Sequence, residues 1–205
     1  FATVPLEAED PQGWRIDPWT VAAVAFEPSY VGGWTALHHW DLTDQLFSTV
    51  VIITAKSVAR REREIGGARF ELRHRPSSAL FGTRRVWREG RPVDVSDPER
   101  TLVDCLDDPA LGAGVRHVAE ALTQWHVSAD RDVQRLIDYA ERVGNRTIFK
   151  RLGYLLEALG IDDPELIATS LGRITRGISL LDPGRPAVGS ITTRWNLRVN
   201  AVIEP

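Results

Sequence analysis

Hydrophobic and polar positions in the first fifty residues follow a helical pattern for the most part. Residues 17–26 open with Asp17-Pro18, an N-cap followed by a proline at the first helical position, and predict a helix that ends before Pro28. Tyr30 to Gly33 then predicts a turn into a second short helix that begins near Trp34. Ahead of both, residues 1–5 have the pattern of a strand end.

Strand signals dominate from residue 49 to residue 95. The β-branched run 49–54 predicts a buried strand, and the alternation in 69–75 predicts a half-buried strand with one charged face. Gly66-Gly67 predicts the turn before that strand. Segments 85–89 and 92–95 predict a β-hairpin around Gly90-Arg91, so this region is expected to build a sheet.

Helical spacing replaces the alternation from residue 96 onward. Ser96 and Glu99 form a capping box, with Ser96 as the predicted N-cap of the helix that follows. Further amphipathic helices are predicted at 115–125, 133–143, 147–159 and 164–171. Alternation returns at 191–203 around Trp195, and we expect this closing segment to return to the sheet built from residues 49–95.

Strands and helices therefore come in separate runs, which predicts an α+β fold with a mixed or antiparallel sheet and a helical bundle packed on it. We expect a single domain over residues 1–205. Its parts would be an α/β basic lobe at 1–95, a helical lobe at 96–172 and closing strands at 173–205.

Charge is segregated along the 205 residues although the net charge is only −3. Residues 56–91 contain eleven basic and four acidic residues, while residues 92–141 contain four basic and eleven acidic residues. All but two of the 25 basic residues are arginines, whose rigid guanidinium fork pairs with phosphate or carboxylate. The basic block is either a surface for such a partner or a region whose arginines pair with the acidic helices that follow.

We take the first alternative as the functional hypothesis and predict a nucleic-acid or partner contact surface in the basic block. Its candidate residues are Arg60, Arg61, Arg63, Arg69, Arg73, Arg84, Arg85 and Arg88.

Motifs for catalysis, cofactors and metals are absent from the sequence. It has no phosphate-binding glycine loop, no CxxC or HExxH spacing and no GxSxG, so we predict no cofactor, no metal and no catalytic residue. Cys105 is predicted to be a buried helical residue, and the five histidines to have packing or surface roles. The acidic cluster Asp104, Asp107 and Asp108 is predicted to end a helix and balance nearby arginines.

The sequence also predicts the cellular compartment of the protein. No apolar stretch is long enough to span a membrane, and residues 1–10 do not have the pattern of a signal peptide. The only cysteine is Cys105, which excludes an internal disulfide and fits a reducing compartment. We therefore expect a cytoplasmic protein without a membrane partner.

Four segments stand out by their order and spacing. They are 30–37 with 41–45, 95–104, 151–157 and 194–200. Together they resemble the AbiEi-type antitoxins of type IV toxin–antitoxin systems, and the resemblance covers about residues 1 to 202. Each of these segments also has a plain structural interpretation as part of the scaffold.

The resemblance implies a protein of two parts. An N-terminal winged-helix domain would bind operator DNA and repress its own operon, and a larger C-terminal domain would counteract a nucleotidyltransferase-like toxin. This chain would be the larger domain. Because the sequence has no methionine and no visible helix-turn-helix, we expect the winged-helix domain upstream.

Two other functions stay open at this stage. The first is a metal-dependent enzyme acting on nucleotides through Asp104 and Asp108, which are one helical turn apart. The second is a plain protein-interaction domain.

Overall fold

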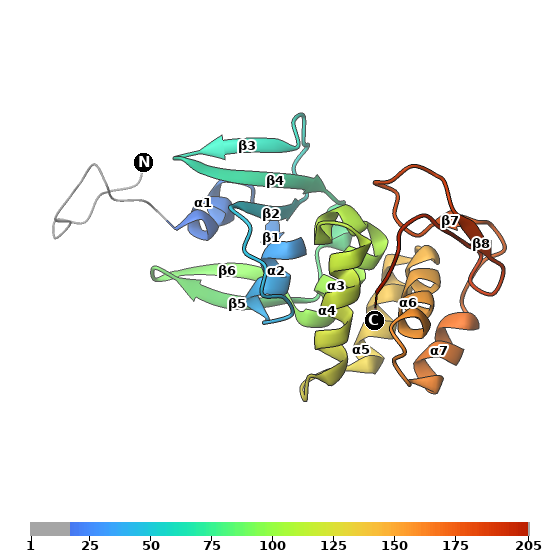
Figure 1. Cartoon of the computed structure of the whole chain (residues 1–205). Helices are drawn as coiled ribbons and strands as arrows, with labels where there is room; N and C mark the ends of the chain where they lie inside the picture. Colours follow the sequence, from blue (N-terminus) through green and yellow to red (C-terminus); the bar gives the residue numbers. More distant parts are fainter. Residues whose placement is uncertain (1–16, 205) are drawn as a thin grey trace, which may run out of the picture.

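A mixed six-stranded sheet, a helical bundle and a small second sheet make up the computed structural model, which describes residues 17–204 (Figure 1). Helices pack on the large sheet, so the predicted α+β class is confirmed. The predicted strand end at residues 1–5 lies outside the described residues.

The large sheet has the strand order β3-β4-β2-β1-β6-β5. Its strands are β1 (Ser29–Val31), β2 (Thr49–Thr54), β3 (Glu62–Ile65), β4 (Ala68–His74), β5 (Thr83–Arg88) and β6 (Arg91–Ser96). β2 pairs with β4, and β1 with β6, in parallel, and the other neighbours are antiparallel. The predicted strands at 49–54 and 69–75 and the predicted hairpin around Gly90 are confirmed.

Each face of this sheet packs on different helices. Val50 and Ile52 of β2 join a core cluster with α1 (Pro18–Ala25), whereas Val51 and Ile53 join the cluster of the helical bundle. The alternation of side chains along a strand produces this division. We call the two sides the α1 face and the bundle face of the sheet. The short helix α2 (Gly33–His39) contributes to both clusters.

The bundle is organised around α3 (Pro98–Asp107), which has eight buried residues. The other helices of the bundle are α4 (Val115–Val127), α5 (Val133–Val143), α6 (Thr147–Ala158) and α7 (Pro164–Leu171), with the 3-10 helix η2 (Pro109–Gly112). A second 3-10 helix, η1 (Ser77–Ala79), lies between β4 and β5. Gly144 ends α5 and Gly160 follows α6, both with positive φ, as the sequence predicted for these positions.

The closing strands do not return to the large sheet, so that prediction was wrong. β7 (Ser179–Leu180), β8 (Ser190–Thr192) and β9 (Leu197–Val199) form their own sheet in the order β7-β9-β8. Trp195 explains the difference, because it is buried in the β8–β9 turn and its indole donates a 2.6 Å hydrogen bond to Glu157 of α6. The small sheet is thereby attached to the bundle.

The N-cap of α3 is Asp97 rather than Ser96. The Asp97 side chain accepts a hydrogen bond of 2.8 Å from the amide of Arg100, while the hydroxyl of Ser96 bonds that of Thr101. Glu99 does not take part in a capping box. It is buried and accepts hydrogen bonds from the indole of Trp125 and the amide of Asp132.

Candidate macromolecule-binding surface

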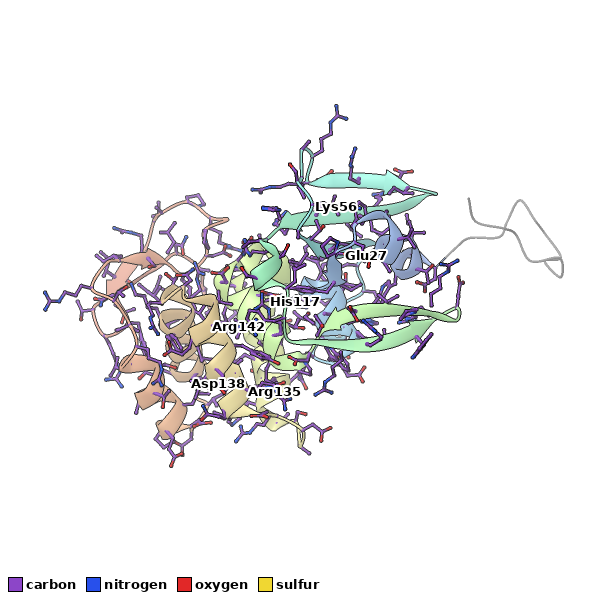
Figure 2. The ribbon with its side chains drawn as sticks, turned by 180° about the vertical axis from the view of Figure 1, so that it is seen from behind. Glu27, Lys56, His117, Arg135, Asp138 and Arg142 are labelled. Atoms are coloured by element: carbon purple, nitrogen blue, oxygen red, sulfur yellow. The ribbon has the colours of Figure 1, made fainter. Side chains whose placement is uncertain are left out.

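Two β-hairpins carry most of the predicted contact arginines. The hairpins β3–β4 and β5–β6 extend in the same direction, away from the bundle, and α1 lies between them (Figure 1). Seen from behind, Lys56 marks the β3–β4 side of this region (Figure 2). The hairpins thus hold two groups of arginines on either side of one helix.

The strand register assigns these arginines to the two faces of the sheet. Arg63 is paired with Phe70, whose ring packs on Phe26 beside α1, so Arg63 lies on the α1 face. Arg84 is paired with Val95 of the α1-side cluster and lies on the same face. Arg69 and Arg85 alternate with these positions and lie on the bundle face.

Two of the three predicted arginines on the bundle face pair with carboxylates, whereas Arg69 forms no ion pair with any residue among 17–204. The guanidinium of Arg73 lies 2.6 Å from Glu71 and 3.5 Å from Asp108, and its side chain is only 11% exposed. Arg85 pairs with Asp94 at 2.9 Å, and this contact raises the pKa of Arg85. Arg73 is therefore an internal residue, and the proposed surface does not include it.

Arginines near the α1 face form no ion pair with any residue among 17–204. This group consists of Arg60, Arg61, Arg63, Arg84 and Arg88. The guanidinium carbon of Arg88 lies 4.5 Å from the ring centroid of Trp19, and that of Arg84 lies 5.2 Å from Trp40. Stacking holds these two cations without neutralising them.

Helix α1 itself has no charged residue. Ala22 is buried, whereas Val24 is 65% exposed. A helix that is apolar on all sides is normally covered. We define the α1 surface as this helix with the flanking arginines Arg60, Arg61, Arg63, Arg84 and Arg88.

An aromatic stack connects α1 with α2 at one edge of this surface. The ring of His39 lies 5.1 Å from that of Trp19 and 4.5 Å from that of Trp40, both in edge-on geometry. Burial, and then the nearby charge of Arg88, lower the pKa of His39. His39 is a packing residue, as the sequence predicted.

The sequence prediction missed Trp87, which is 70% exposed on edge strand β5. It is paired with Pro92 and lies on the bundle face near Arg85, on the opposite side from Arg84 and Arg88. The sequence could have indicated the exposure of Trp87. In a hairpin strand, Trp87 and the neighbouring apolar Val86 point to opposite faces, so only one of them can face the core.

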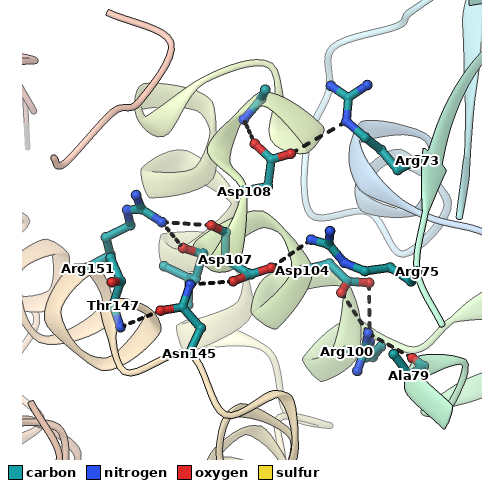
Figure 3. A network of polar contacts seen from close by, with 12 residues as sticks. Arg73, Arg75, Ala79, Arg100, Asp104, Asp107, Asp108, Asn145, Thr147 and Arg151 are labelled. Atoms are coloured by element: carbon teal, nitrogen blue, oxygen red, sulfur yellow. Dashed lines mark hydrogen bonds and ion pairs between the residues drawn. The ribbon is translucent and has the colours of Figure 1, made fainter. Parts of the chain in front are cut away.

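The three aspartates of α3 are separated by their partners (Figure 3). Asp104 is buried and binds Tyr30 and Arg100, Asp107 pairs with Arg75 at 2.7 Å, and Asp108 faces Arg73. Burial raises the pKa of Asp104 against the opposing charge of Arg100. Among residues 17–204, no group of three acidic, histidine or cysteine side chains could hold a metal ion.

Cys105 is a core residue of α3 rather than an activated thiol. Cys105 is buried, and burial raises the pKa of its thiol well above the ordinary value. Of the helices in residues 17–204, none has the length and apolar character to cross a membrane.

Comparisons with known proteins support the fold class. The chain is similar in structure to the RV2827C protein from Mycobacterium tuberculosis, with a TM-score of 0.59 and 16% sequence identity over 82% of this chain. The chain spans 61% of the length of that protein. No protein-family model matches the sequence, and no curated protein matches it. The likeness to RV2827C therefore shows the fold alone.

Proposed function

We propose that this chain is the larger domain of an AbiEi-type antitoxin and that it counteracts a nucleotidyltransferase-like toxin in the cytoplasm. The segments that resemble this family support the proposal because they contact one another. Tyr30 of the first segment bonds Asp104 of the second, Arg151 of the third donates to Leu106 just beyond the second, and Trp195 of the fourth packs on Gly153 of the third. The resemblance thus involves one connected core.

The single observation that carries the proposed mode of action is the α1 surface. It combines an uncharged, partly exposed helix with five guanidinium groups that have no acidic partner among residues 17–204. Protein interfaces typically have an apolar centre and a polar rim, and arginine is enriched in them. We therefore infer that a toxin surface with an apolar centre and acidic rim docks on α1.

DNA is the second proposed partner, because Arg60, Arg61 and Arg63 lie together at the start of β3 and are exposed. Guanidinium groups at such a position can contact phosphates without reading the sequence. Operator recognition would then depend on an upstream winged-helix domain. Helix α1 would contribute little to DNA binding, since it has no cationic side chain to pair with a phosphate.

We propose a binding protein rather than an enzyme. Each of Asp104, Asp107 and Asp108 binds a different arginine, so each carboxylate already has a cationic partner. This pairing argues against a shared metal ion at these aspartates.

Val24→Glu tests toxin docking, because it places a charge at the centre of the α1 surface while leaving the core intact. The affinity for the toxin, measured by calorimetry, should fall by more than ~10-fold, a cost of about 1.4 kcal/mol. Arg176→Glu is the matched control, since Arg176 is exposed in the loop before β7 and far from α1. Unchanged affinity for Val24→Glu would refute docking on α1.

The triple change Arg60→Glu, Arg61→Glu and Arg63→Glu tests the DNA contact. Binding to duplex DNA should weaken, and the slope of log affinity against log salt should flatten by about 1 for each lost phosphate contact. A triple variant that keeps the original slope would reject phosphate contact at this hairpin, whatever its effect on toxin binding.

A further inference from the structure

A hollow of about 330 Å³ lies where the two lobes meet, and the proposed function does not use it. It is bounded by the segment around η1, by α3 and by the C-terminal end of α5. Its lining includes Arg75, Arg100, Arg142, Phe81 and Asp107. Three guanidinium groups therefore converge on one open cavity, from three elements that are far apart in the sequence.

Phe81 holds two of these cations in place. The guanidinium carbon of Arg142 lies 3.7 Å from its ring centroid and that of Arg100 lies 4.0 Å from it. Arg100 is neutralised by Asp104 at 2.9 Å, but Arg142 is exposed and forms no ion pair or hydrogen bond among residues 17–204. Arg142 thus keeps its full charge and all its donors at the rim.

Arg75 lies on the α3 side of the hollow. One of its terminal nitrogens donates to Asp107 at 2.7 Å, and its side chain remains 31% exposed (Figure 3). Asp107 also accepts a hydrogen bond of 2.6 Å from Asn145, so its carboxylate is already occupied by two donors. The remaining donors of Arg75 are available to a ligand.

The charge around the hollow is positive. Arg75, Arg100 and Arg142 face two carboxylates, those of Asp104 and Asp107. Behind Asp107, the buried Arg151 donates to the backbone carbonyl groups of Leu106 and Asp107, which adds a further positive charge near the same end of α3 (Figure 3). Among the residues that line the hollow, three guanidinium groups against two carboxylates leave an excess of one positive charge.

We propose that this hollow binds a phosphate group, with Arg142 and Arg75 as its ligands. Guanidinium groups bind phosphate oxygens in pairs of charge-assisted hydrogen bonds, and a volume in the range of small-molecule sites accommodates a mononucleotide. The phosphate belongs either to a free nucleotide or to a nucleic-acid backbone, and both sources present the same oxygens to Arg142.

Titration of the purified chain with inorganic phosphate, AMP and a short DNA duplex distinguishes these sources. Arg142→Gln removes the rim cation without breaking a hydrogen bond to any residue among 17–204, and Arg176→Gln is the exposed control. We expect calorimetric binding of phosphate and AMP that weakens by ~10-fold or more in Arg142→Gln and is unchanged in Arg176→Gln. Tighter binding of AMP than of phosphate would identify a nucleotide site.

If only the duplex binds, and its binding is also weaker in Arg142→Gln, the ligand is a backbone phosphate. The inference is overturned if none of the three probes binds, or if Arg142→Gln binds them as the original chain does. Arg75→Gln provides a second variant from another element, and its melting temperature shows whether the loss of the Asp107 contact affects folding. None of these variants changes the α1 surface, so failure here leaves the antitoxin proposal standing.

Discussion

The hydroxyl of Tyr30 donates a 2.7 Å hydrogen bond to Asp104, which joins β1 to α3 across 74 positions of the sequence. Arg100 pairs with the same carboxylate at 2.9 Å and donates to the Tyr30 hydroxyl at 3.2 Å. All three side chains are buried. Because a buried ion pair needs its remaining polar atoms satisfied, the Tyr30 hydroxyl supports the pair at the junction of sheet and bundle, although the Nη1 of Arg100 has no hydrogen-bond partner among residues 17–204.

Tyr30→Phe removes that hydroxyl and leaves both charged partners in place. We expect a loss of about 1–3 kcal/mol in the free energy of unfolding, since Asp104 and Arg100 each lose a buried partner. Urea denaturation measures this loss. Tyr154→Phe is the matched control, because the Tyr154 hydroxyl forms no hydrogen bond among residues 17–204. Equal stability of the two variants would contradict the structural role of Tyr30.

Local signals predicted most of the helices and the strands β2 and β4, but not β1, where the sequence indicated a turn at residues 30–33. Asp17-Pro18 caps α1 as expected, and Gly144 ends α5 in the left-handed conformation that favours glycine. The capping residue of α3 was misplaced by one position, because Ser96 and Asp97 are both good N-caps and only the contact of Ser96 with Thr101 decides between them.

Elements whose stability depends on tertiary contacts were not predictable in the same way. β3 has four exposed residues, two of them glutamates, so it lacks the apolar alternation that indicates a strand. The small sheet was assigned to the wrong partner, because alternation around Trp195 shows a strand-like segment but not the sheet to which it belongs. Trp195 packs on Gly153, a contact that no local pattern records.

The candidate surface was predictable as a list of arginines but not as an arrangement. Their division between the α1 face and the bundle face depends on the register of β3 with β4 and of β5 with β6. Arg73 illustrates the consequence, since its pairing with Asp108 joins segments that are 35 positions apart and is invisible in the sequence.

Gly153→Ala should destabilise the protein although alanine favours helices. A methyl group at position 153 would lie 2.0 Å from the indole of Trp195, which is closer than two non-bonded carbon atoms can approach. The expected cost is about 1–3 kcal/mol from overpacking, against a gain of up to ~1 kcal/mol in helix propensity. Thermal unfolding of Gly172→Ala is the comparison, because the nearest atoms to a methyl group there are 3.6 Å away. A stabilised Gly153→Ala variant would disprove the close packing.

Arg151→Lys should release the small sheet from the bundle. The buried guanidinium of Arg151 donates to four backbone carbonyl groups, two at the end of α3 and two in and after β7. An ammonium group has only three donors on a single nitrogen, so at least one buried carbonyl group loses its partner, at about 1–3 kcal/mol each. Hydrogen exchange should show faster exchange in β7 and β9. Arg194→Lys, which changes an exposed pair with Glu157, should leave these rates unaltered.

Acidification should weaken the contact between α1 and α2 through His39. Burial and Arg88 lower the pKa of His39 below its ordinary value of 6.5, whereas Asp41 opposes the shift. In the unfolded chain the imidazole takes up a proton at a higher pH than in the folded protein. The folded state therefore has its full stability at a pH above the unfolded pKa, and it loses stability as the pH falls from there through the folded pKa.

Urea denaturation between about pH 7.5 and pH 5.5 measures this loss, in the range where histidine changes charge. His39→Gln should show a shallower decrease in the free energy of unfolding than the original chain. His126, whose pKa is lowered by burial and by Arg131, contributes a slope of the same sign, so the double variant His39→Gln and His126→Gln should be shallower still. If His39→Gln has the same pH dependence as the original chain, the stacked imidazole between Trp19 and Trp40 is not kept neutral by its surroundings.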